Sequence, residues 1–241
     1  MLKHCANEGF DSFNEEEKKK CYALYGKYYE NNNEYFKAFI FFDKAEDYDG
    51  WLRTVQKDVG VDLAVTEPKE VLRVIEKCSV EKICQNPWSA LVLMRRLFTW
   101  RQIPKMLEIK NMLTEYVKTN TELSETEKGD ILGECDLIMS FLCYNDIAAM
   151  SRLHRSASKL MSKSAVSIRT YGSWTFGSPS VLMMFHREKG NLQNELDTMN
   201  ESMPYYYKVT EGHGQGAELL MQAEAYFMQG DIIKAYIELE K

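Results

Sequence analysis

The residues most able to do chemistry are the four histidines, and their spacing does not assemble a reaction centre. None of His4, His154, His186 and His213 lies four residues from another, so no pair shares a helical face, and no H-E-x-x-H motif occurs. Nothing resembles the G-x-S-x-G turn that presents a catalytic serine. Carboxylates stand in runs such as residues 15–17, which are typical of solvated helix faces. We therefore predict a non-enzymatic chain with no catalytic residue, metal or cofactor.

One glycine-rich stretch, residues 212–216 (Gly-His-Gly-Gln-Gly), could direct backbone N–H groups toward an anion at the start of a helix. It lacks the Lys-Ser/Thr pair of a phosphate-binding loop, and no strand is expected before it. We favour a tight turn that opens a helix, and an anion site remains the alternative.

Aromatic and basic residues form two clusters that could bind a ligand or a partner. Aromatic side chains with a polar edge are common in sites for sugars, nucleobases and peptides. The segment from Ile147 to Arg187 contains six basic residues and no Asp or Glu, which would suit an anionic group or an acidic partner. Packing of the aromatic rings between helices, and solvation of the basic face, are the favoured alternatives. The candidate effector- or partner-binding residues are Trp174, Phe176, Tyr205, Tyr206, Tyr207, His213, Arg152, His154 and Arg155.

Composition narrows the class of protein. The net charge is −6, and the six basic residues of the segment 147–187 leave −12 on the remainder, which argues against general nucleic-acid binding. The six cysteines form no C-x-x-C pair, so we expect reduced thiols, most of them packed among apolar residues. No apolar run reaches the roughly 18 residues of a membrane helix, and the charged N-terminus does not resemble a signal peptide. A cytoplasmic protein without membrane contact is the expectation.

Helical hairpins with the spacing of tetratricopeptide repeats must position these residues. Aromatic and small residues of the first such segment fit the two helices of the repeat: Tyr22, Tyr25, Gly26, Tyr29, Ala38 and Phe42. The same layout returns near the end of the sequence, around Gly230-Asp231: Leu219, Ala223, Tyr226, Ala235 and Leu239. A hairpin of this kind cannot bury its own apolar face and needs a stacked neighbour. We therefore expect the last repeat to be truncated and homo-oligomers to be possible.

These patterns predict an all-α fold, a right-handed superhelix of about eleven helices in antiparallel pairs. Capping boxes should open helices after Asn14 and after Ser124, and Asn86-Pro87 should start a central helix. The second helix should run from Tyr35 to about Val55. We predict one TPR-like domain over residues 1–241, with a first pair in 14–60, central pairs in 61–163, an ordered aromatic loop in 164–180 and C-terminal pairs in 181–241.

A family resemblance rests on Ala-Met-Ser-Arg-Leu-His (149–154), Gly-Ser-Trp-Thr-Phe-Gly-Ser-Pro-Ser (172–180) and the stretch from Met-Pro-Tyr-Tyr-Tyr to Gly-Ala-Glu (203–218). From about Phe42 to the end, the chain resembles the helical middle region of the large LuxR-type, ATP-dependent transcriptional regulators, the MalT-like family. In that family the repeat region lies between an ATPase and a helix-turn-helix domain, and it binds inducers or partner proteins.

The resemblance implies a signal-sensing domain of a bacterial transcription regulator, which binds a small-molecule effector or a protein. Its further partners would be the ATPase and helix-turn-helix domains of the same full-length protein. No Walker A motif is present and no DNA-reading helix is recognised, so we expect no direct nucleic-acid binding. The resemblance carries over no site residue. A stand-alone TPR scaffold with a peptide groove is the alternative, and an all-α enzyme with a site in the superhelix lumen is a third interpretation.

Overall fold

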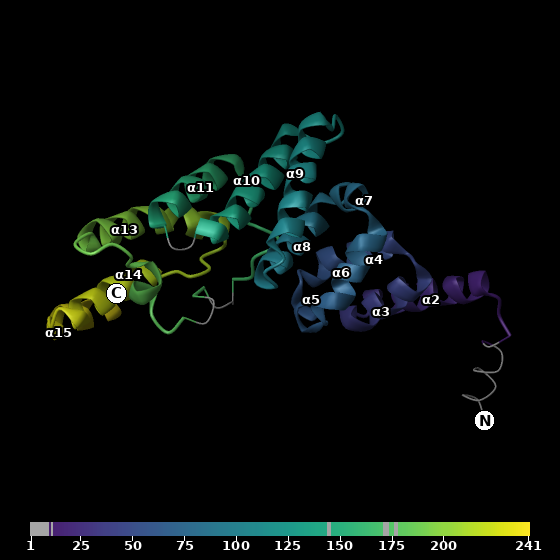
Figure 1. Ribbon diagram of the computed structural model, residues 1–241, viewed down its shortest axis with the longest axis horizontal. Coiled ribbons are helices and arrows are strands. Elements are labelled where there is room, and N and C mark those ends of the chain that lie inside the picture. The colour runs from purple at the N-terminus through teal and green to yellow at the C-terminus, as the bar shows by residue number, and fades with distance from the viewer. Residues whose placement is uncertain (1–9, 11, 144–145, 171–173, 176–177) are drawn as a thin grey trace, which may run out of the picture. The chain divides into compact units, whose positions relative to one another are not determined.

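The structure is a computed structural model that describes residues 10, 12–143, 146–170, 174–175 and 178–241 (Figure 1). Over these residues the chain is 75% helical and contains no strand, which confirms the predicted all-α class. Fourteen α-helices are described, and eleven of them have seven or more residues, in agreement with the predicted number. The handedness and the superhelical arrangement stay predictions.

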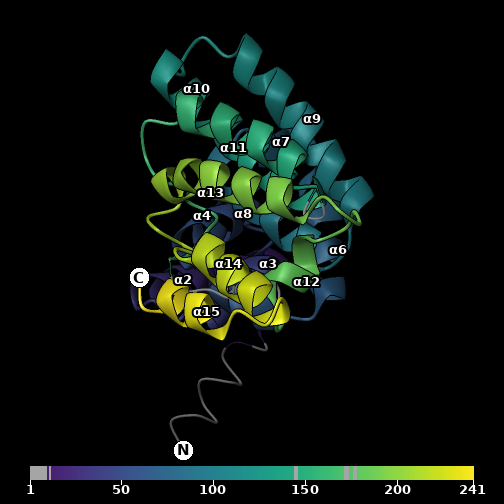
Figure 2. The same cartoon turned by 90° about the vertical axis from the view of Figure 1, so that its left-hand side faces the viewer.

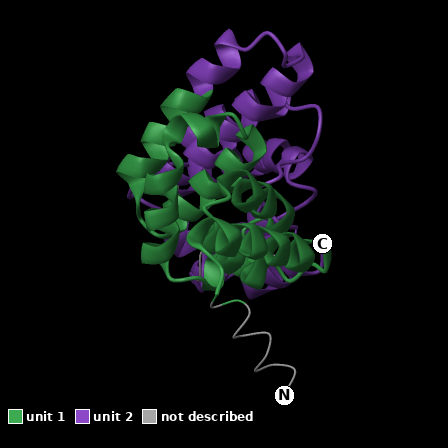
Figure 3. Cartoon of the chain, turned by 90° about the vertical axis from the view of Figure 1, so that its right-hand side faces the viewer, with its two compact units in different colours: residues 1–113 green, residues 114–241 purple. Residues whose placement is uncertain are grey.

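The chain divides into two compact units, residues 1–113 and residues 114–241, which are coloured separately in Figure 3. Unit 1 contains seven complete helices: α2 (Glu15–Asn31), α3 (Tyr35–Ala45), α4 (Tyr48–Asp58), α5 (Val61–Val65), α6 (Pro68–Cys78), α7 (Val80–Cys84) and α8 (Pro87–Thr99). The next helix, α9 (Ile103–Thr119), contributes residues to both units. Unit 2 contains α10 (Glu125–Ser140), the 3-10 turn η1 (Phe141–Cys143), α11 (Ile147–Leu160), α12 (Val181–Phe185), α13 (Leu192–Val209), α14 (Ala217–Met228) and α15 (Ile232–Leu239).

Local sequence signals fix several helix starts. The capping boxes of Asn14 with Glu17 and of Ser124 with Glu127 are both formed, because each cap side chain accepts from the N–H of the glutamate and each glutamate accepts from the N–H of the cap. The central helix α8 begins at Pro87, as predicted. Five consecutive apolar residues of this helix are buried, which places buried side chains on every side of it. The helix therefore lies in the core of unit 1.

The predicted second helix was wrong in its extent. Helix α3 ends at Ala45, the backbone turns at Glu46 with φ 55°, and a separate helix α4 begins at Tyr48. The carboxylate of Asp47 accepts a hydrogen bond from the N–H of Gly50 at 2.9 Å, so this aspartate caps the new helix. This cap splits the segment that was predicted to form one helix.

The first and last hairpins share one hydrogen-bond pattern, which supports the repeat spacing read from the sequence. In the turn from α2 to α3, Glu34 N–H donates to the carbonyl of Tyr29 at 2.9 Å. In the turn from α14 to α15, Asp231 N–H donates to the carbonyl of Tyr226 at the same distance. Helices α14 and α15 pack side by side (Figure 2).

A side-chain arrangement repeats as well. Lys37 pairs with Glu34 and its Nζ lies 5.0 Å from the centre of the Tyr29 ring. Lys234 pairs with Asp231 and lies 5.4 Å from the ring centre of its tyrosine, Tyr226. The hairpins are therefore structurally equivalent residue by residue, from the tyrosine to the lysine.

In unit 2, two carboxylates of α10 accept hydrogen bonds from the segment that follows α11. Asp130 accepts hydrogen bonds from the backbone N–H and the hydroxyl of Ser162, at 2.6 and 3.0 Å. Glu134, one turn further along, accepts from the N–H groups of Val166 and Ser167 at 2.9 and 2.7 Å. Burial raises the pKa of Glu134 despite these hydrogen bonds. The side chain thus ties the irregular segment to the core of the unit.

Replacing Glu134 by alanine should lower the free energy of unfolding of unit 2 by about 2–3 kcal/mol, because two backbone N–H groups lose their acceptor. Glu134→Gln keeps one acceptor oxygen, so we expect about half of that loss. Urea denaturation followed by circular dichroism measures both values. Equal stability of wild type and Glu134→Ala would show that water replaces the carboxylate without cost.

Three of the five described cysteines are buried, and the other two are half-buried. Cys21, Cys78, Cys84, Cys135 and Cys143 form no disulfide, and Cys5 lies outside the described residues. Burial raises the pKa of Cys78 to about 11 and that of Cys84 to about 12, so both are protonated at neutral pH. Among the described residues, no helix combines the length and the apolar character that a membrane span requires.

Candidate functional site

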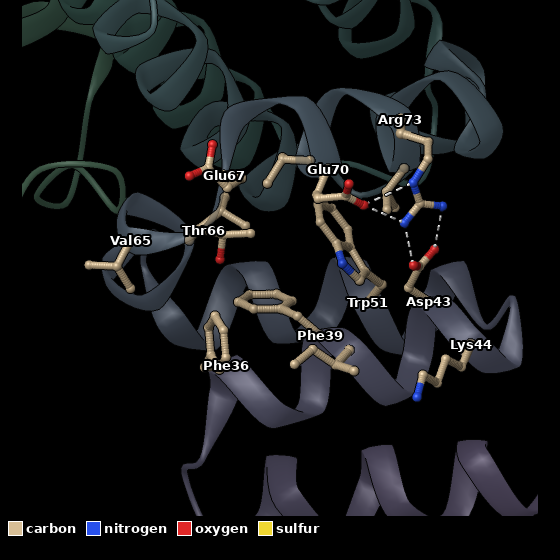
Figure 4. Close-up of a pocket in the computed structure, with 14 residues that line it drawn as sticks. Phe36, Phe39, Asp43, Lys44, Trp51, Val65, Thr66, Glu67, Glu70 and Arg73 are labelled. Atoms are coloured by element: carbon tan, nitrogen blue, oxygen red, sulfur yellow. Dashed lines mark hydrogen bonds and ion pairs between the residues drawn. The ribbon is translucent and has the colours of Figure 1, made fainter.

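A groove in unit 1 offers a recess for a ligand. It lies between α3, α5 and α6, with α4 at its base, and encloses about 380 Å³ (Figure 4). This volume is within the range of about 300–1,000 Å³ that is usual for small-molecule sites. The lining consists of Phe36, Phe39, Ile40, Asp43, Lys44, Trp51, Leu63, Val65, Thr66, Glu67, Glu70, Val71, Arg73 and Val74.

The apolar floor of the groove comes from helical spacing on α3. Phe36, Phe39 and Ile40 occupy one stripe of this helix, and Phe39 packs against Trp51 of α4 with ring centres 5.4 Å apart. Phe39 is buried, but Phe36 remains 45% exposed and Ile40 41% exposed. Val65, at the end of α5, is 76% exposed. The groove therefore offers solvent-facing apolar side chains above a packed base.

Carboxylates position the short helix α5 at the edge of the groove. Both oxygens of Asp58 accept from the first turn of α5, from Asp62 N–H at 2.8 Å and from Leu63 N–H at 3.1 Å. Asp62 in turn accepts from the N–H of Phe36 at 3.0 Å, which connects α5 to the start of α3. These bonds satisfy N–H groups that a helix start leaves without partners. The position of Val65 relative to Phe36 follows from this network.

The opposite edge carries an ion-pair network of one guanidinium and two carboxylates. The guanidinium of Arg73 binds both oxygens of Asp43, at 2.5 and 3.3 Å, and its Nε donates to Glu70 at 3.1 Å (Figure 4). The hydrogen bonds to Asp43 raise the pKa of Arg73 above its usual value. The network fixes this edge as a charged border beside the apolar floor.

The apolar floor and the charged edge of this groove suit the binding of a ligand that has both apolar and polar parts. As the structure describes it, its lining includes no histidine, cysteine or serine that could act as a nucleophile or as a general base near neutral pH. An apolar group seated on Phe36 and Ile40 would remove both side chains from water, and the charged edge would orient polar groups of the same ligand.

Three of the predicted site residues come together in the interior of unit 2. His154 of α11 and Tyr206 of α13 have ring centres 4.9 Å apart. The hydroxyl of Tyr206 lies 2.7 Å from Nδ1 of His213, in the turn before α14. All three side chains are buried. They pack α11, α13 and the glycine-rich turn against each other, and their role as effector ligands stays a prediction.

The other predicted residues lie around this cluster. Arg155 donates to the hydroxyl of Tyr205 at 2.9 Å, and its guanidinium carbon lies 4.4 Å from the centre of that ring. Tyr207 donates to Glu218 at the start of α14. Arg152 is exposed on α11.

Trp174, in the predicted aromatic loop, covers the glycine-rich turn. Its ring approaches Gly214 so closely that a Cβ there would lie 2.3 Å from the indole, and its ring centre lies 5.5 Å from that of Phe185. The turn interpretation of residues 212–216 agrees with positive φ angles at Gly212, Gly214 and Gly216. Phe176 lies outside the described residues.

Sequence reasoning missed the groove of unit 1. The spacing of Phe36, Phe39 and Ile40 indicates one apolar stripe on a helix, but it does not show that only Phe39 becomes buried. The width of this stripe could have indicated the groove, because the stripe is wider than one neighbouring helix can cover. The pairing of Asp43 with Arg73 gave no signal, since it joins residues of two different helices, α3 and α6.

Comparison with known proteins gives no family for this chain. No protein-family model matches it, and neither a curated protein nor a solved structure shows a match. Among the described residues, no three His, Cys, Asp or Glu side chains are grouped closely enough to hold a metal ion.

Proposed function

We propose that this chain is a non-catalytic helical binding module, and that the groove of unit 1 receives an apolar group of its ligand. The observation that carries the proposal is the presence of three exposed apolar side chains around one recess, Phe36, Ile40 and Val65. Single exposed apolar residues are common on protein surfaces, but a group of them lining one cavity is typical of a binding site.

The ligand class that fits best is a peptide segment with apolar side chains at helical spacing. Such a segment can place two or three anchors on the floor, and its polar side can face the edge formed by Asp43, Glu70 and Arg73. A small effector with one apolar part would use the same floor.

A signal-sensing role in a transcription regulator is the second candidate. It is favoured by the packing of the motifs that carry the resemblance: His154 belongs to one of them, Trp174 to another, and Tyr206 and His213 to the third. These segments are far apart in the sequence, yet each takes part in the packing of α11, α13 and the turn before α14. In this proposal a ligand bound by the domain would alter that packing.

The binding proposal can be tested by selecting helical peptides from a displayed library against the intact protein. Selected peptides should bind Ile40→Glu at least 10-fold more weakly than wild type, which corresponds to about 1.4 kcal/mol. Leu24→Glu is the matched control, because Leu24 is 70% exposed in the same unit and does not line the groove. Fluorescence anisotropy gives the dissociation constants. Peptides that bind both variants as tightly as wild type would place the binding site elsewhere.

A further inference from the structure

A second apolar groove, in unit 2, lies between α12, α14 and α15. It encloses about 390 Å³, and Glu224 is the one charged residue among those described in its lining. The carboxylate of Glu224 accepts from the N–H of Leu182 at 2.7 Å. The exposed fractions are 61% for Phe227, 77% for Met228 and 61% for Leu239. The groove is thus an apolar surface that the described residues leave open to solvent.

The first hairpin of the same chain shows what covers an equivalent surface. By the shared turn pattern, Ala223, Phe227 and Leu239 of the last hairpin correspond to Gly26, Glu30 and Phe42 of the first. These last three residues form the seat of α4. The seat is closed, since Phe42 is 1% exposed whereas its counterpart Leu239 is open to solvent.

Helix α4 fits its seat through one small residue and two cations. A Cβ on Gly50 would lie 2.5 Å from the Phe42 ring, so only glycine allows the helix to approach this closely. Arg53 and Lys57 bind the buried carboxylate of Glu30, at 2.8 to 2.9 Å. Burial raises the pKa of Glu30, but the hydrogen bonds from both cations outweigh it and hold the pKa below its usual value.

We propose that the groove of α12, α14 and α15 is the docking site for an amphipathic helix of a partner protein. This helix resembles α4 in placing a small residue over Leu239. It differs from α4 in carrying apolar residues where α4 has Arg53 and Lys57, because Phe227 stands at the position of Glu30. A cation at these positions would be desolvated against an aromatic and apolar surface without a carboxylate partner.

A second copy of this chain cannot supply its own α4 to the groove. Its own α4 is already packed, with Trp51 and Leu52 buried in unit 1. A folded copy therefore cannot present this helix to a neighbour. The groove is also distinct from the proposed ligand site, since its lining residues all belong to unit 2.

Peptides derived from residues 46–60 test the proposal against the intact protein. All carry the same i,i+7 hydrocarbon staple at positions 49 and 56, which face solvent in α4, so that helicity is matched. The probe is the R53L/K57L peptide, with a fluorophore for anisotropy. We expect it to bind at least 10-fold more tightly than the peptide of native sequence. Adding Gly50→Val to the probe should weaken binding at least 10-fold.

Protein variants locate the site. Leu239→Glu and Met228→Glu should each weaken binding of the R53L/K57L peptide at least 10-fold. Both positions are exposed, and a circular dichroism spectrum like that of wild type checks that each variant is folded. Ile40→Glu, in the groove of unit 1, should leave it unchanged, so failure of this inference is separable from failure of the proposed function.

Two results would overturn the inference. The first is equal binding of the native and R53L/K57L peptides, or equal binding by wild type and Leu239→Glu. The second is a sedimentation equilibrium in which Leu239→Glu abolishes dimers that the peptide does not displace, since the occupant would then be a second copy.

Discussion

Replacing Phe42 by alanine is expected to lower the free energy of unfolding of unit 1 by about 3–5 kcal/mol, the usual cost of removing a buried phenylalanine. The ring is 1% exposed and lies between two glycines. A Cβ on Gly26 would stand 2.7 Å from it, and one on Gly50 would stand 2.5 Å from it. Helices α2 and α4 both pack on this side chain of α3, so the cavity cannot close without moving a helix.

The matched control for this experiment is Leu239→Ala. Leu239 holds the equivalent position in the last hairpin but is 61% exposed, so its truncation should change the free energy of unfolding by no more than about 0.5 kcal/mol. Urea denaturation followed by circular dichroism measures the free energy of unfolding for both variants, because helices of both units contribute to the signal. Tryptophan fluorescence additionally reports on unit 1, since Trp51, Trp88 and Trp100 belong to it and only Trp174 belongs to unit 2. A similar loss of stability for both variants would contradict the conclusion that this position is covered in the first hairpin and exposed in the last.

Acid should destabilise unit 2 through His154. Burial lowers the pKa of this histidine to about 4, from an ordinary value near 6.5. Between these two values the unfolded chain binds the proton and the folded protein does not. Stability from this residue is therefore fully present above pH 6.5 and is lost as the pH falls toward 4, by about 3 kcal/mol.

The surroundings of His154 explain the direction of this effect. Its Nε2 lies 3.0 Å from the Ser140 hydroxyl, which itself donates to the carbonyl of Leu137 at 2.6 Å. Nε2 is thus the protonated nitrogen of the neutral ring. Nδ1 is buried and makes no hydrogen bond, so a second proton would place an N–H and a charge without a partner beside Tyr206.

Denaturation of wild type and His154→Phe at several pH values checks this prediction. The phenylalanine variant keeps a ring against Tyr206 and cannot titrate, so the wild type should lose about 3 kcal/mol more than the variant between pH 6.5 and pH 4. Parallel stability curves for the two proteins would show that His154 is solvated or paired in the folded state.

The helices of this chain follow closely from local sequence. The capping boxes at Asn14 and Ser124 and the Asn86-Pro87 start are formed by residues within three positions of each other, so their geometry depends little on distant contacts. The same is true of the repeat spacing around Tyr29 and Tyr226, whose turn bonds the structure reproduces. The break at Glu46 was missed because helical propensity alone does not show that Asp47 will cap a new helix.

The candidate site could be predicted only in part. Sequence spacing identified Phe36, Phe39 and Ile40 as one helical stripe, but it could not show which of them would remain exposed. That outcome depends on where α5 and α6 lie, and α5 is held by hydrogen bonds from Asp58 and Asp62. Burial of His154 and Tyr206 likewise follows from the packing of α11 on α13.

The amino-acid sequence by itself determined the all-α class, the main helix starts and the equivalence of the first and last hairpins, because these depend on contacts between residues a few positions apart. Tertiary structure alone decided that Phe42 is covered and Leu239 is not, and that an apolar stripe on α3 becomes the floor of a groove. The physical reason is that the exposure of a side chain depends on which helix packs against it. A local sequence pattern does not show which helix that will be.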